Sequence, residues 1–135
     1  MKHLLRVLLP LMFSAIMSGC AIIPERSGVA STPMAPGSAI ALLQPVQVGN
    51  VVVTPLAVVE DSRCPINARC IWAGRLVVRS RIDGAGWRDT ADLTLGEPYG
   101  THTSVIALTE GEPPPEAGEG RDIAPEDYRF TFEAR

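Results

Sequence analysis

Apolar residues recur at every second position through most of the chain after Pro45, and this alternation constrains the fold more than any other feature. A period of two places alternate side chains on opposite faces of an extended strand. In residues 71–82 one face would carry Trp72, Leu76, Val78 and Ile82, and the other would carry Arg75, Arg79 and Arg81. We therefore expect Trp72 and its neighbours to pack in a core while the arginines face water.

Further strands are expected at residues 51–59, 87–95, 103–109 and 128–133. Pro55 within the first of these indicates an edge position or a bulge, and Asp83-Gly84-Ala85-Gly86 is typical of a hairpin turn. Residues 124–127 are expected to form one helical turn. No segment after Pro45 shows a convincing 3.6-residue period, so we predict an all-β fold. It would be a small two-sheet antiparallel sandwich of about five to eight short strands.

The first nineteen residues have the pattern of a secretory signal peptide. Lys2, His3 and Arg6 form a basic region before an apolar run over residues 7–17, which is shorter than the roughly 20 residues needed to span a bilayer. Met17-Ser18-Gly19-Cys20 resembles the lipobox of bacterial lipoproteins, with Met17 in place of the usual Leu. The resemblance implies cleavage before Cys20 and lipid on its side chain and new amino terminus. Ala21 in place of Asp implies an address in the bacterial envelope, lipid-anchored at the periplasmic face of the outer membrane.

Residues 20–44 are rich in Pro, Ser, Gly and Ala, so we expect a flexible tether, followed by one domain over residues 45–135. The alternative is that Ile40 to Leu43 forms a first strand packed on the domain. From Cys20 onward the chain has fifteen acidic residues against ten scattered arginines and no lysine. That balance argues against binding nucleic acid or anionic lipid through charge.

Cys64 and Cys70 remain as a pair once Cys20 carries lipid, and an oxidising compartment favours a disulfide between them. Five intervening residues lose the Cys-x-x-Cys geometry of redox catalysts. A structural zinc needs four ligands, and His102 is the one other nitrogen ligand after Cys20. We therefore expect a short-range structural disulfide, no metal and no cofactor. The residues that it encloses form a candidate recognition loop: Pro65, Ile66, Asn67, Ala68 and Arg69.

Familiar catalytic motifs, such as G-x-S-x-G, H-E-x-x-H and a phosphate-binding glycine loop, do not occur in the chain. General base chemistry would have to rest on His102 or on a carboxylate, so we expect no enzyme and assign no catalytic residue. Asp61 is expected to pair with Arg63 or to cap the turn that follows it. Residues 110–122 are acidic and contain three consecutive prolines. We expect a surface loop there, with a calcium-binding or partner-binding loop as the alternative.

Three short motifs carry a further resemblance: Asp61-Ser62-Arg63-Cys64-Pro65, Cys70-Ile71-Trp72-Ala73-Gly74 and Ile123-Ala124-Pro125-Glu126-Asp127-Tyr128. They are similar to motifs shared by a group of small bacterial lipoproteins and secreted proteins, and the resemblance covers residues 45–135. It implies a compact β-rich domain with one disulfide. The group has no established activity, so the resemblance adds no catalytic residue.

The sequence therefore predicts a lipid-anchored envelope protein that serves binding or assembly. Its expected partners are the membrane, through the anchor, and an envelope protein or ligand, but no nucleic acid. The alternative is a protease inhibitor that acts through residues 64–70 and presents Arg69. Such inhibitors gain affinity from a pre-organised loop, and the loop must be extended around the exposed side chain.

Overall fold

A computed structural model describes residues 32–135, which form seven strands and one short 3-10 helix. The predicted signal peptide, Cys20 and the first part of the predicted tether lie outside the described residues. The strands are β1 (Val46–Val48), β2 (Val51–Asp61), β3 (Leu76–Gly84), β4 (Trp87–Thr94), β5 (Pro98–Gly100), β6 (Val105–Glu112) and β7 (Arg129–Ala134), with helix η1 (Pro125–Asp127) before β7. Within residues 32–135 no helix has the length and apolar character needed to cross a membrane.

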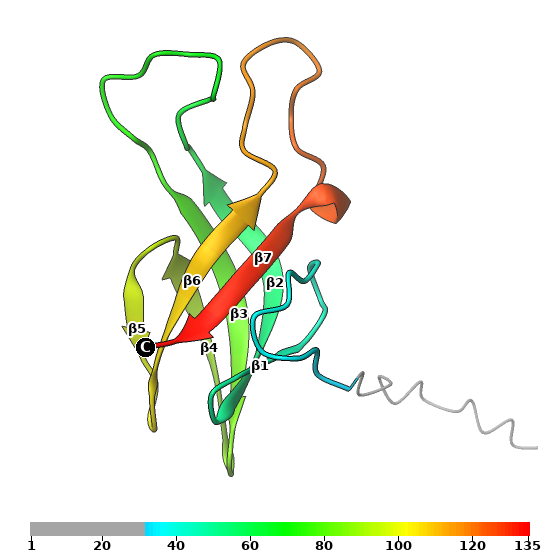
Figure 1. The fold of residues 1–135 in the computed structure, drawn as a ribbon, viewed down its shortest axis with the longest axis vertical. Coiled ribbons are helices and arrows are strands. Elements are labelled where there is room, and N and C mark those ends of the chain that lie inside the picture. The colour runs from blue at the N-terminus through cyan, green and yellow to red at the C-terminus, as the bar shows by residue number, and fades with distance from the viewer. Residues whose placement is uncertain (1–31) are drawn as a thin grey trace, which may run out of the picture.

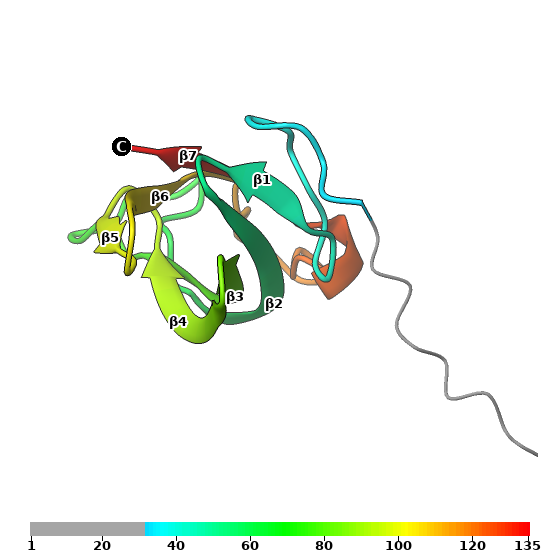
Figure 2. The same cartoon turned by 90° about the horizontal axis from the view of Figure 1, so that it is seen from below.

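The strands form two antiparallel sheets, which confirms the predicted all-β sandwich. One sheet has the order β1-β2-β3-β4 and the other β5-β6-β7 (Figure 1). Seen along the strands, the four-stranded sheet curves under the three-stranded one, with β1 beside β7 (Figure 2). The two sheets pack face to face because each has one apolar face to bury.

The core lies between the sheets and consists of alternate residues from both. Phe130 and Phe132 of β7 are its largest fully buried side chains, and Tyr128 stacks on Phe130 with ring centroids 5.6 Å apart. The predicted aromatic face of the last strand is therefore confirmed. The opposite sheet contributes mainly aliphatic side chains: Val46, Val48, Val51, Val53, Leu76, Val78, Ile82 and Leu93.

Several local predictions for β2, β3 and β4 are confirmed. The register of β2 against β3 shifts between Pro55 and Ala57, which is the expected bulge at the proline. The β3–β4 hairpin closes with Gly84 opposite Trp87, so only two residues form its turn. The indole ring of Trp87 lies so close to Gly84 that a side chain there would collide with it.

Trp72 is not in the core, contrary to the prediction. Its side chain is 70% exposed, and β3 begins only at Leu76. The reason lies at Gly74, which has a φ of 66° and passes so close to Ser62 that no side chain would fit. A residue in this left-handed conformation interrupts the alternation, so the core-facing period of β3 does not extend back to Trp72.

The predicted domain boundary at residue 45 is also wrong. Ile40 is completely buried in the core, and it exchanges two backbone hydrogen bonds with Phe130, at 3.0 and 2.9 Å. Met34 forms a parallel bridge with Val46. Residues 32–44 therefore belong to the domain. The alternative that residues 40–43 pack on the domain is correct in substance, although Leu42 and Leu43 form a turn rather than a strand.

We predict that Ile40→Ala lowers the free energy of unfolding by about 2–5 kcal/mol, since it leaves a cavity beside Phe130. Leu43→Ala is the matched control, because Leu43 is 69% exposed and its truncation should change stability by about 0.5 kcal/mol or less. Urea unfolding of the two variants and the wild type measures both effects. Equal stability of Ile40→Ala and wild type would show that residues before 45 are not part of the folded domain.

Candidate functional site

Two long loops lie together at one end of the sandwich. The cysteine loop, residues 62–75, connects β2 to β3, and the proline loop, residues 113–124, connects β6 to η1 (Figure 1). The backbone N–H of Ile66 donates to the carbonyl of Pro115 at 3.0 Å. Both loops therefore protrude beyond the same ends of the strands, and they support one another.

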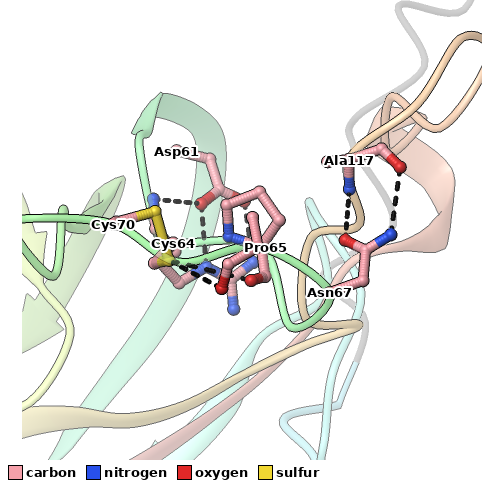
Figure 3. The surroundings of a disulfide bond; sticks show 8 residues. Asp61, Cys64, Pro65, Asn67, Cys70 and Ala117 are labelled. Carbon is pink, nitrogen blue, oxygen red and sulfur yellow. Dashed lines mark hydrogen bonds and ion pairs between the residues drawn. A yellow bond between two sulfur atoms is a disulfide. The ribbon is translucent and has the colours of Figure 1, made fainter.

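Asn67 joins the loops with its side-chain amide. Its Oδ1 accepts from the backbone N–H of Ala117 at 2.7 Å, and its Nδ2 donates to the Ala117 carbonyl at 3.1 Å (Figure 3). This pair of bonds satisfies both backbone groups of Ala117, as a neighbouring strand would. A residue predicted as part of a recognition surface thus has a structural role as well.

The predicted disulfide between Cys64 and Cys70 is confirmed, with Cα atoms 5.9 Å apart. Inside it, the Ala68 N–H donates to the Pro65 carbonyl at 3.0 Å and closes a tight turn. Below it, the Cys64 N–H donates to the Ala73 carbonyl at 3.0 Å. The loop is therefore fixed by a covalent bond and by backbone bonds on both sides of that bond.

The base of the loops is held by Asp61, Arg63 and Tyr128. The Nε and Nη2 atoms of Arg63 donate to the two carboxylate oxygens of Asp61 at 2.8 and 2.7 Å. The Tyr128 hydroxyl donates to Asp61 Oδ2 at 2.9 Å. Arg63 also donates to the carbonyls of Gly111 and Pro113, at the start of the proline loop. The predicted pairing of Asp61 with Arg63 is confirmed.

This cluster is largely shielded from water, with the Asp61 and Arg63 side chains only 9% and 14% exposed. Burial by itself raises the pKa of the Asp61 carboxyl. The hydrogen bonds from Arg63 and Tyr128, together with the charge of Arg63, outweigh burial and hold that pKa below its ordinary range. Burial, with the bond to Asp61 as a second cause, raises the pKa of Tyr128 to about 12.

Three large apolar side chains are exposed on the cysteine loop. Ile66 is 65% exposed, Ile71 90% and Trp72 70%. We call these three residues the apolar tip. Single exposed apolar residues are ordinary, but three on one short, fixed loop are a feature of contact surfaces. Ile66 is one of the five predicted recognition residues. Of the other four, Asn67, Ala68 and Arg69 are also exposed, whereas Pro65 is half-buried.

Two open cavities of about 260 and 210 Å³ border the proline loop and share Glu116, Arg121, Asp122 and Ile123. Glu116 and Arg121 form an ion pair across them. In residues 32–135 no three His, Cys, Asp or Glu side chains are grouped so that they could hold a metal ion. The calcium-binding alternative for this loop therefore has no such group of side chains behind it among the described residues.

His102, the one candidate base from the sequence, lies at the other end of the sandwich. Its Nε2 is 2.7 Å from Asp89 Oδ2, and its ring lies against Trp87 with centroids 4.6 Å apart. The side chain is 60% exposed, and it borders an open depression of about 220 Å³. The Ser104 hydroxyl contacts Thr101 instead of His102, so these residues do not form a nucleophile and base pair.

Sequence reasoning did not find the bond from Tyr128 to Asp61 or the bonds from Asn67 to Ala117. The bond from Tyr128 to Asp61 joins two of the motifs identified in the sequence, Asp61-Ser62-Arg63-Cys64-Pro65 and Ile123-Ala124-Pro125-Glu126-Asp127-Tyr128. Their presence in one chain was the available signal, although nothing in either motif indicates that the two are in contact. Nothing in the sequence indicated the bonds from Asn67 to Ala117.

No protein-family model, characterised protein or solved structure matches this chain.

We predict that Asp61→Asn makes stability less dependent on pH in the acid range. A carboxyl whose pKa is lowered on folding stabilises the protein above its unfolded pKa, near 4, and this contribution is lost as pH falls through the folded pKa. The variant should lose about 1–3 kcal/mol at pH 7, because Arg63 loses its charged partner. Its stability should then fall less than that of the wild type between about pH 5 and 2.

Urea unfolding at a series of pH values measures this difference. Asp92→Asn is the matched control, because Asp92 pairs with Arg79 on the open surface, where water screens the ion pair and its loss should have little effect on stability. Parallel pH profiles for wild type and Asp61→Asn would contradict the role given to Asp61.

Proposed function

We propose that the protein is a lipid-anchored protein of the bacterial envelope whose β-sandwich is a non-catalytic binding or assembly module. The observation that carries the proposal is the apolar tip. Ile66, Ile71 and Trp72 remain in water although a buried core lies below them. A folded domain that leaves such residues exposed on a fixed loop gains most when a partner covers them.

The loop structure supports a binding role because it lowers the entropic cost of association. The disulfide, the turn at residues 65–68 and the bonds to Ala117 leave the backbone little freedom to lose. A pre-organised loop converts more of its contact energy into affinity than a flexible one. Tryptophan and arginine are also the residue types most often dominant in protein interfaces, and Trp72 and Arg69 lie on this loop.

The proposed anchor is compatible with a site that acts close to a membrane. Thr32, the first described residue, follows Cys20 by twelve positions. An extended chain of that length reaches about 40 Å. A lipid on Cys20 would therefore keep the domain within a few tens of ångströms of the bilayer and raise its effective concentration toward other envelope components.

The alternative, a protease inhibitor acting through residues 64–70, has less support. Inhibitory loops offer an extended backbone to the protease, whereas residues 65–68 form a tight turn closed by the bond from Ala68 to Pro65. Asn67 is moreover held against Ala117 and is not free to enter an active site. The geometry thus favours a contact surface over a substrate-like loop.

The anchor is tested with Cys20→Ser in the full chain. We expect the wild type to fractionate with membranes and to carry acyl mass on Cys20. The variant should carry no acyl mass, and it should either retain its signal peptide or no longer fractionate with membranes. Intact mass spectrometry of protein isolated from its native membrane measures both. A wild-type chain without added acyl mass would refute the anchor and leave the binding role to be judged separately.

The binding role is tested by the size of the native complex in gently solubilised envelopes. We expect the wild type to migrate above the mass of its monomer, and Ile71→Ser/Trp72→Ser to migrate as a monomer. Leu43→Ser is the matched control, because Leu43 is exposed to the same degree as Trp72 but is hydrogen-bonded to Pro55 within β2 and not to either loop. A monomeric wild type, or a complex that survives in the double variant, would rule out the apolar tip as the contact surface.

A further inference from the structure

Opposite charges are divided between the two loops. The cysteine loop contains Arg63, Arg69 and Arg75 but no acidic residue. The proline loop contains Glu116, Glu119 and Asp122 against the single Arg121. The arginines at this end of the molecule thus lie mainly on one loop and the carboxylates on the loop beside it, although Arg63 is largely buried.

Only part of this charge is paired within the molecule. Arg63 is paired with Asp61, and Arg75 with Glu60 at the end of β2. Among residues 32–135, no ion pair joins the cysteine loop to the proline loop, and Arg69, Glu119 and Asp122 belong to none. An exposed cation and two exposed carboxylates therefore remain available to an external partner.

We infer that the partner of this end is a second copy of the same chain, in a two-fold symmetric dimer. A two-fold axis that runs between the loops places the basic cysteine loop of each copy against the acidic proline loop of the other. The same rotation brings the apolar tip of each copy to the exposed Pro113 and Pro114 of the other. A surface whose two halves complement one another is what an isologous dimer requires.

The size of the surface agrees with this assignment. The two loops comprise fourteen and twelve residues. Interfaces of standard size use about 20–30 residues on each side. The pairing has an apolar centre and a charged rim, and complementary rim charges set the orientation of two partners.

A bilayer fits the same end less well. Glu116, Glu119 and Asp122 lie on the proline loop, which is hydrogen-bonded to the cysteine loop at Ile66 and Asn67. Insertion of the apolar tip would therefore bring these carboxylates toward the headgroups, where anionic lipids repel them. A different protein would need its own apolar surface with a basic rim. A second copy of this chain already has an apolar surface, the apolar tip, with the exposed Arg69 beside it.

The inference depends on the proposed contact role of the apolar tip, and site-specific photo-crosslinking in intact envelopes tests it. The full chain is expressed in two forms with different epitope tags, each with p-benzoylphenylalanine in place of the exposed Ala68. We expect a product of twice the monomer mass that carries both tags. The probe in place of Leu43, which is also exposed but is hydrogen-bonded to Pro55 within β2 and not to either loop, should give no such product.

Charge exchange then tests the orientation. Arg69→Glu alone and Glu119→Arg alone should each reduce the dimer product about fivefold or more, because each homodimer then has two like-charge contacts. Co-expression of the two single variants should restore it, since every contact between them is of opposite charge. Recovery of the dimer product on co-expression requires that both variants fold. Misfolding of either variant therefore cannot explain such a recovery. Arg135→Glu, at the chain end, should have no effect.

The other outcomes separate this inference from the proposed function. A cross-link only to a different protein, or only to lipid, would overturn the dimer and leave the tip a contact surface. No cross-link from position 68 would contradict both. Equal dimer product from positions 43 and 68, or no restoration by the charge-exchanged pair, would overturn the dimer as described.

Discussion

The loop end of this protein depends on one carboxylate. Asp61, the last residue of β2, accepts hydrogen bonds from Arg63 in the cysteine loop and from Tyr128 at the start of the last strand. Arg63 in turn binds two carbonyls where the proline loop leaves β6. Charge-assisted bonds of this kind are strong when they are shielded from water. Three segments distant in the sequence are thereby fixed around a single charge.

The cluster of Asp61, Arg63 and Tyr128 fixes the base of the two loops, and this explains how apolar residues of the cysteine loop can stay exposed. A flexible loop bearing Ile66, Ile71 and Trp72 would reduce its contact with water by folding over onto the sandwich. Here the disulfide, the turn inside it and the bonds to Ala117 hold the loop away from the sheets. The molecule therefore keeps these apolar side chains in water at a cost in solvation.

The two sheets depend on a different constraint, the burial of residues that the alternation placed on one face. The prediction succeeded for the aromatic face of β7, the bulge at Pro55 and the hairpin before Trp87, because each follows from local periodicity or turn chemistry. It failed at Ile40, since a segment of Pro, Ser, Gly and Ala with one short apolar stretch has the composition of a linker. Only the open edge of β7 reveals why Ile40 is bound there.

The sequence alone determined the all-β class, the approximate strands, the disulfide and the pairing of Asp61 with Arg63. These are local properties, set by alternation, by turn residues and by the few ways two cysteines can be used. Tertiary structure alone decided that Tyr128 completes the Asp61 cluster, that Asn67 joins the loops and that Trp72 faces water. Each of these is set by which loops meet in space, and by one residue, Gly74, whose backbone conformation ends the alternation that would have placed Trp72 in the core.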